Sequence, residues 1–332
     1  MRLENFLALT QAVLANEPCI NSFENIVFEA SRVRRGDLFF AYNHEEIDIA
    51  IANGAYGVVF ERTAQVKDSE IAWIEVNSLD YALKKLLRFK MIEKDVVAYE
   101  CNEIVLKLSL QVITQSNFLA LSGDLKSVFR SLWNIEDKTI ILFCPALNDK
   151  TIFATVKKIP DTSLSPIDII EQTLFETSFI YENVFYERQL ISPFFIPYLE
   201  QLLHLYKILK IEYRLKKFTP IEHFEAVFIN RKFEIKNFGT SDKVLIFEPN
   251  IELIDPQMLF LERHASWAKI IFIAPFNTKL QECKDIFNYK NEKDIVNILR
   301  NNNFNFALIT GVDKSILNRP LSNQTQLTMD FY

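Results

Sequence analysis

Short apolar runs alternate with longer amphipathic segments along the first part of the chain, a pattern typical of strands that alternate with helices. Runs such as Leu38–Ala41 and Val58–Phe60 are apolar throughout, which indicates strands buried on both faces, as in a parallel sheet covered by helices. The pattern predicts an α/β domain over residues 1–93. The expected elements are strands at 25–28, 38–42, 58–60 and 71–76, and helices within 1–20, at 46–53 and at 79–89.

The same alternation continues in two further sections. Residues 94–216 are expected to form a second α/β domain, and residues 217–319 a third, with a hairpin followed by a β-α-β-α-β order and therefore a parallel sheet. Residues 320–332 are polar and are expected to form an extended tail. The expected elements are strands at 96–99, 139–144, 226–229, 233–235, 244–247, 269–274 and 306–309, and helices at 104–114, 126–134, 161–175, 197–211, 256–268 and 292–301.

Composition narrows the functional classes. Of the 332 residues, 49% are hydrophobic and 24% are charged, which is typical of a globular protein. The net charge of −6 argues against a general nucleic-acid binder, which needs a basic surface. No apolar run reaches the roughly 18 residues of a membrane span, and the first residues carry charges rather than a leader-like apolar segment. We expect a cytoplasmic protein that inserts in no membrane.

Cysteine and glycine usage bears on the chemistry. Cys19, Cys101, Cys144 and Cys283 lie far apart and form no metal-ligand spacing, so neither a metal site nor a disulfide framework is expected. The chain has six glycines, and none stands in a phosphate-binding pattern. No catalytic residue can be nominated from the sequence.

Two motifs suggest a family. Residues 31–41 are Ser-Arg-Val-Arg-Arg-Gly-Asp-Leu-Phe-Phe-Ala, and residues 54–61 are Gly-Ala-Tyr-Gly-Val-Val-Phe-Glu. Together they resemble the amino-terminal domain of the Mur ligases, closest to the member that joins D-alanyl-D-alanine to UDP-MurNAc-tripeptide (MurF). Ala30 departs from the family's Asp at the first position. The alternative interpretation is a strand-turn-strand in which Gly36 and Asp37 serve only the turn.

The resemblance implies an α/β, three-domain Mur-ligase-like architecture with a shortened central domain and a parallel-sheet carboxyl-terminal domain. It also implies that Ser31, Arg32, Phe40 and His44 are candidates for contact with a UDP-sugar. His44 stands in a shortened loop, so it is a remnant of the family's pattern or an ordinary exposed histidine. The later matches, Phe218–Pro220, Val244–Glu248 and Leu308–Gly311, are less specific because they are mostly hydrophobic strands.

The features of ATP chemistry in the family are not found at the corresponding positions. A glycine-rich loop should follow the strand at 96–99, but the sequence there is Glu-Cys-Asn-Glu-Ile-Val-Leu-Lys, with two acidic residues and no glycine. No Gly-Lys pair occurs in the chain. Phe143–Pro145 stands where the family has a metal-binding Glu at the end of the strand that corresponds to 139–144, and 222–224 replaces the family's junction arginine. No cofactor is therefore expected.

Three functions remain open. The leading hypothesis is a non-catalytic homologue, a pseudoenzyme of bacterial peptidoglycan precursor synthesis or cell-wall morphogenesis. As a binding or scaffold protein, it would bind a UDP-MurNAc-peptide or pair with Mur enzymes or other cell-wall proteins. The second is an active MurF-type ligase, which alone would require ATP and Mg²⁺. The third is a partner-binding module that uses the tail residues Gln326, Leu327, Met329 and Phe331, which resemble peptides that dock on the bacterial sliding clamp.

Overall fold

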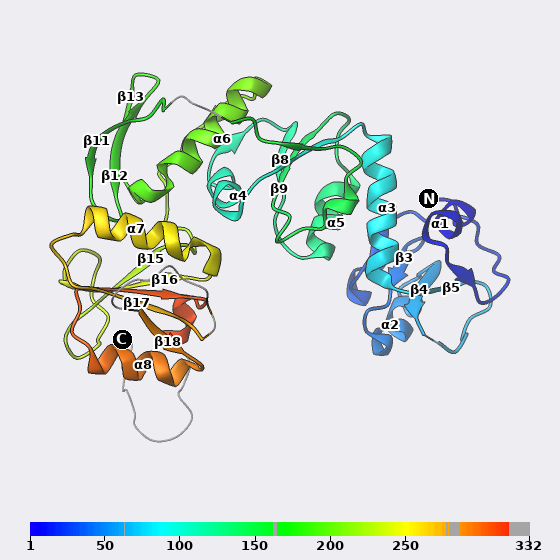
Figure 1. Cartoon of the computed structure of the whole chain (residues 1–332). Helices are drawn as coiled ribbons and strands as arrows, with labels where there is room; N and C mark the ends of the chain where they lie inside the picture. The colour runs from blue at the N-terminus through cyan, green and yellow to red at the C-terminus, as the bar shows by residue number, and fades with distance from the viewer. Residues whose placement is uncertain (63, 162–164, 277, 279–285, 319–332) are drawn as a thin grey trace. The chain divides into compact units, whose positions relative to one another are not determined.

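The computed structural model describes residues 1–62, 64–161, 165–276, 278 and 286–318. Contacts divide the chain into two compact units, the first made of residues 1–106 and 114–160, and the second of residues 107–113 together with the chain from 161 onward. The segment expected as one central domain, 94–216, is therefore shared between the two units. Each unit is described by itself (Figure 1).

The first unit begins with a mixed sheet in the order β1-β5-β4-β3-β2. Strands β2 to β5 are parallel, and β1 is antiparallel to β5. Its elements are α1 (Leu3–Thr10), β1 (Val13–Leu14), β2 (Ile26–Val27), β3 (Leu38–Phe40), α2 (Ile47–Ala52), β4 (Gly57–Glu61), β5 (Ala72–Val76) and α3 (Leu79–Glu93). The first helix ends at Thr10, earlier than the expected limit of residue 20, because the chain then turns to form β1.

Alternate residues of these strands enter two different apolar clusters. Phe39 and Val58 pack in the cluster that includes residues of α2, whereas Phe40 and Val59 pack in the cluster that includes residues of α3. Both faces of the sheet are thus buried, which explains why the strands are apolar throughout. Gly36 has a φ of 100°, so the expected turn before β3 uses the left-handed region that glycine favours.

A second parallel sheet completes the first unit, in the order β10-β6-β9-β8. Residues of both sheets, among them Val59 and Ile141, belong to one cluster with the inner face of α3. The first unit therefore has a core that is continuous between its sheets. The elements of this sheet are β6 (Val97–Glu100), β8 (Phe118–Ala120), α5 (Leu125–Trp133), β9 (Ile140–Phe143) and β10 (Val156–Lys158).

The second unit contains an antiparallel sheet that the sequence pattern did not predict. The helix expected at 161–175 is wrong, because Asp168–Gln172 forms a strand that pairs with Thr177–Tyr181. This pairing depends on neighbouring strands rather than on local propensity. The elements are α4 (Glu103–Ser109), which crosses the boundary between the units, β7 (Ile113–Thr114), β11 (Asp168–Gln172), β12 (Thr177–Tyr181), β13 (Val184–Gln189), α6 (Ile196–Leu209) and β14 (Tyr213–Arg214).

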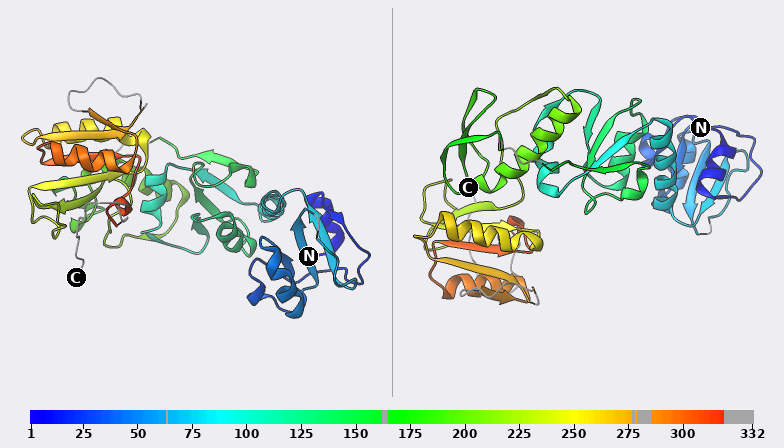
Figure 2. Two further views of the ribbon diagram at one scale, coloured as in Figure 1. Left: turned by 90° about the horizontal axis from the view of Figure 1, so that it is seen from below. Right: turned by 45° about the horizontal axis from the view of Figure 1, so that its top comes forward.

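The carboxyl-terminal sheet of the second unit has the order β15-β16-β19-β17-β18. Strands β16 to β19 are parallel, as predicted, and β15 is antiparallel to β16. The expected hairpin is reduced to a bridge between Ile229 and Ile235. Helices α7 and α8 cover opposite faces of this sheet (Figure 2). The elements are β15 (Glu225–Ile229), β16 (Lys243–Glu248), α7 (Ile254–His264), β17 (Ile270–Pro275), β18 (Ile286–Tyr289), α8 (Glu292–Asn301) and β19 (Phe306–Thr310).

Among the residues that the structure describes, no helix combines the length and the apolar character that a membrane span requires.

Candidate functional site

Three of the four candidate ligand contacts lie at one edge of the first sheet. Ser31 and Arg32 belong to a short 3₁₀ helix, Ala30–Arg32, that follows β2, and His44 opens another, His44–Glu46, that follows β3. All three side chains are exposed. Because β2 and β3 are parallel, both turns leave the sheet at its carboxyl edge, where open α/β sheets commonly bind ligands.

Phe40 has a different environment from the other three candidates. It is fully buried and makes edge-to-face contacts with the rings of Phe6 and Phe28. Its side chain therefore belongs to the core, and among the four candidates only Ser31, Arg32 and His44 are accessible. Asn53 fixes the turn that carries Ser31 by donating a hydrogen bond to the carbonyl of Ala30, 2.9 Å away.

Charged and aromatic groups surround this edge. Glu29 forms ion pairs with Arg32, at 2.6 Å, and with Arg130 of α5. Tyr42 donates a 2.6 Å hydrogen bond to Asp80, and Lys126 lies 3.8 Å from the centre of the Tyr42 ring. Burial, followed by the hydrogen bond to Asp80, raises the pKa of the Tyr42 hydroxyl, so it is a neutral donor. Arg32 is exposed, and an exposed ion pair contributes only about 0–1 kcal/mol, so Arg32 can turn toward an anionic ligand at little cost.

The connection from β6 to α4 is the position at which the family resemblance predicts a phosphate loop. Only Cys101 and Asn102 separate the strand from the helix. The backbone N–H of Cys101 donates to the carbonyl of Phe143, and the Asn102 side chain accepts from the N–H of Val105. The first helical residue is Glu103. These contacts already use backbone N–H donors of the turn. The Glu103 carboxylate adds negative charge that would repel a phosphate at this position.

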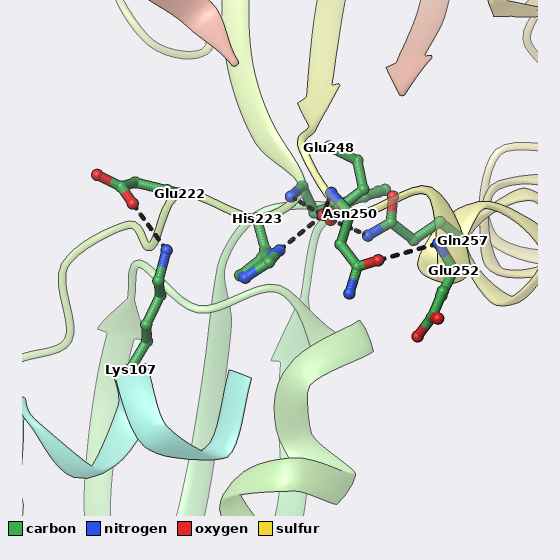
Figure 3. A network of polar contacts seen from close by, with 8 residues as sticks. Lys107, Glu222, His223, Glu248, Asn250, Glu252 and Gln257 are labelled. Carbon is green, nitrogen blue, oxygen red and sulfur yellow. Dashed lines mark hydrogen bonds and ion pairs between the residues drawn. The ribbon is translucent and has the colours of Figure 1, made fainter. Parts of the chain in front are cut away.

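A buried polar network lies at the carboxyl edge of the carboxyl-terminal sheet (Figure 3). Glu248, the last residue of β16, is 0% exposed. Its carboxylate accepts hydrogen bonds from His223 Nδ1 at 2.6 Å, from the Asn250 N–H at 2.9 Å, from the Phe224 N–H at 3.2 Å and from Gln257 Nε2. Four donors compensate the burial of this carboxylate.

The network holds the segment before β15 against the sheet. Phe224 has a φ of 47°, a conformation that is uncommon for a bulky residue. Its N–H donates to Glu248, and its ring contacts Phe175, Phe194 and Phe260. These contacts stabilise the unusual backbone, which indicates a structural role for the network.

A small, mainly apolar cavity adjoins His223. It has a volume of about 80 Å³ and is lined by residues that include Ile191, Phe195, Phe224 and Phe238. Such a volume accommodates water-sized molecules but no nucleotide, because typical ligand pockets measure about 300–1,000 Å³. The acid-base pair of His223 and Glu248 therefore has no room for a large substrate beside it in this cavity.

Other parts of the chain add little to a site. Within the described ranges, no group of three or more His, Cys, Asp or Glu side chains has the arrangement of a metal site. The candidate tail contacts Gln326, Leu327, Met329 and Phe331 lie outside the described residues. Sequence reasoning did not identify Glu248 as the centre of a network, although an acidic residue that ends an apolar strand was the available signal.

The described chain is thus a mixed α/β protein with parallel sheets. No family model and no curated protein matches the chain. A solved MurF from Acinetobacter baumannii is 9% identical, over 93% of this chain and 95% of that one, with a TM-score of 0.48. A MurF ligase from Thermotoga maritima in complex with ADP is 12% identical, over 88% and 95%, with a TM-score of 0.49. Because both scores lie below 0.5, no residue role is taken from them.

Proposed function

We propose that this chain is a non-catalytic relative of the Mur ligases that acts as a binding or scaffold protein in peptidoglycan precursor synthesis. The ligand that fits this proposal is a UDP-MurNAc-peptide, bound by its uridine end at the carboxyl edge of the first sheet. Ser31, Arg32 and His44 are the contacts that we assign to it. The motif at residues 31–41 supports the choice of ligand, since it resembles the family's uridine-binding segment.

The observation that carries the non-catalytic part is the two-residue connection from β6 to α4. A ligase that activates a carboxylate with ATP needs backbone N–H groups that surround the phosphates, usually in a glycine-rich loop, with a lysine beside them. Here Asn102 caps a seven-residue helix, and Glu100 and Glu103 flank the turn. Both the short connection and the acidic side chains oppose phosphate binding at this position.

Thermal unfolding of the full chain tests the proposal. A ligand that binds only the folded state at 100 times its Kd stabilises it by about 2.7 kcal/mol. We expect UDP-MurNAc-tripeptide to raise the midpoint of the wild-type protein, and ATP with Mg²⁺ to leave it unchanged. Arg32→Ala should abolish the shift. Arg34→Ala is the matched control, because Arg34 is also exposed but lies in the turn that enters β3 at the opposite edge.

Two results would contradict the proposal. A midpoint shift with ATP and Mg²⁺, together with phosphate release in the presence of the tripeptide substrate and D-alanyl-D-alanine, would favour an active ligase. Absence of any shift with the muropeptide, or an equal loss in Arg32→Ala and Arg34→Ala, would exclude the assigned ligand contacts.

A further inference from the structure

A polar hollow opens at the amino edge of the carboxyl-terminal sheet, the edge opposite to Glu248. It has a volume of about 630 Å³ and is lined by Arg231, Asp242, Lys243, Arg300 and the segment 301–305. This size lies within the range of about 300–1,000 Å³ that small-molecule sites occupy. The lining includes three cations and one carboxylate, so the hollow carries a net positive charge in a chain whose net charge is −6.

The fold brings these cations together from separate parts of the sequence. Lys243 is the first residue of β16 and pairs in register with Ile229, the last residue of β15. Arg231 follows two residues after that strand, in a turn that Asn230 fixes by accepting hydrogen bonds from the N–H groups of Lys232 and Glu234. Arg231 is therefore held near the start of β16 by an ordered turn.

Arg300 comes from the last turn of α8, and the chain then passes over the same edge to enter β19. The Val244 N–H donates to the carbonyl of Asn305, which ties this passage to the start of β16. A cation at a helix carboxyl terminus complements the helix dipole, which is sufficient to explain the position of Arg300 at the end of α8. The dipole does not account for the convergence of Arg300 with Lys243 and Arg231.

The positive charges of the hollow are only partly balanced, because Asp242 is its single lining carboxylate. Within the described part of the chain, none of Arg231, Lys243 and Arg300 forms an ion pair with a carboxylate. Lys243 lies instead over the rings of Phe304, at 4.2 Å, and Phe233, at 5.0 Å. Burial, and then repulsion from Arg231, lowers the pKa of Lys243 despite the neighbouring Asp242. A bound anion would relieve this repulsion.

We propose that this hollow binds a small organic ligand that carries at least two phosphate groups. Two guanidinium groups can each present a pair of parallel N–H donors to a phosphate, and the Lys243 ammonium adds a point charge between aromatic rings. Asn301 and Asn303 are exposed at the rim and offer amides to hydroxyl or carbonyl groups of the rest of the ligand. The site is independent of the muropeptide site proposed above, which lies in the other unit.

Nucleic acid fits the observations less well than a small ligand. Nucleic-acid binding normally uses a broad basic surface, whereas here the cations gather at one hollow of a chain with a net charge of −6. A polycarboxylate shares the anionic chemistry, and the experiment below distinguishes it from a phosphate.

Calorimetric titration of the full chain with inorganic pyrophosphate at low ionic strength tests the proposal. We expect saturable binding that weakens as salt is added. The double variant Arg231→Gln/Arg300→Gln should weaken it by at least about tenfold, since each arginine supplies charge-assisted hydrogen bonds. The matched control is Lys157→Gln/Lys158→Gln, which removes the same charge from the exposed strand β10 in the other unit and should leave the affinity unchanged.

Unchanged thermal midpoints of both double variants would confirm that they are folded, and Arg231→Lys/Arg300→Lys should retain part of the affinity. Absence of pyrophosphate binding at millimolar concentration would overturn the proposal, as would an equal loss in the control. Tighter binding of citrate would assign the hollow to carboxylates instead, and tighter binding of a single-stranded oligonucleotide would assign it to nucleic acid.

Discussion

The two edges of the carboxyl-terminal sheet differ in how far their charged side chains are compensated by partners in the same chain. At the carboxyl edge, Glu248 is fully buried and four donors of the same chain compensate it. At the amino edge, Arg231, Lys243 and Arg300 converge beside a single carboxylate, Asp242, and none of the three forms an ion pair within the described part of the chain. The chain itself compensates the carboxylate at the first edge, although Gln257 Oε1 beside it is buried without a hydrogen-bond partner. At the second edge, the cations exceed the carboxylates.

This difference separates structural charges from charges available to a ligand. A carboxylate that is desolvated and hydrogen-bonded stabilises one local conformation, here the entry to β15. Removal of the carboxylate leaves several buried donors without an acceptor. Cations that remain partly solvated and repel one another contribute little to folding, so their convergence favours binding.

Removal of the buried carboxylate should have the largest effect. Glu248→Ala leaves His223 Nδ1, Gln257 Nε2 and two backbone N–H groups without their acceptor. We expect the free energy of unfolding to fall by about 3–5 kcal/mol, measured by urea denaturation. The control is Glu252→Ala, an exposed neighbour in the turn after β16. A loss of less than about 1 kcal/mol would show that water replaces the carboxylate.

An effect of intermediate size on stability is expected at the ion pair between Lys84 and Asp149. The charged atoms are 2.8 Å apart, and each side chain is about one-third exposed. The hydrogen bond from Lys84, and then that from the Thr151 N–H, lowers the pKa of Asp149 to about 2. Because the folded-state pKa lies below the unfolded value of about 3.9, the pair stabilises the fold above pH 4 and this stabilisation is lost as the pH falls toward 2.

The pair's contribution should be about 1 kcal/mol after allowance for solvent screening. Comparison of wild type with Asp149→Asn by urea denaturation from neutral to acidic pH measures it. The variant should be less stable at neutral pH, and the difference should shrink below pH 4. A difference that stays constant with pH would mean that Asp149 acts only as the cap of the following turn, where it accepts from the Thr151 N–H.

The smallest change in stability is expected at the basic hollow. Arg231→Gln/Arg300→Gln removes repulsion around Lys243, so the free energy of unfolding should change by less than about 0.5 kcal/mol. Added salt should stabilise the wild type more than the variant, because it screens that repulsion. Urea denaturation at two ionic strengths measures both. A loss above about 1 kcal/mol would show that the arginines are structural and would remove the contrast between the two edges.

The strands of the parallel sheets could be predicted because their residues are apolar throughout. The runs around Phe39, Val58, Ile246 and Ile273 all form buried strands where the pattern placed them. The strand Asp168–Gln172 could not be predicted, since its residues are exposed and it exists only through its pairing with β12. The partition into two units also depended on packing rather than on pattern.

The candidate ligand contacts show the same limit. The family motif suggested Ser31, Arg32, Phe40 and His44 as ligand contacts, and the structure leaves only Ser31, Arg32 and His44 exposed, at one edge of the sheet. The apolar run Leu38–Ala41 indicated a buried strand, and the packing of α1 and α3 shows which cluster Phe40 enters.

The sequence by itself determined the α/β class, the buried strands and the acidic connection after β6, because these follow from local apolar runs and from the residue types at single positions. The tertiary structure alone decided which charges meet. Glu248 is hydrogen-bonded to His223 and Gln257, and Lys243 lines one hollow with Arg231 and Arg300. Sheet register and helix termini bring the distant residues of each set to one edge. Compensation of charge depends on that proximity, which no linear pattern records.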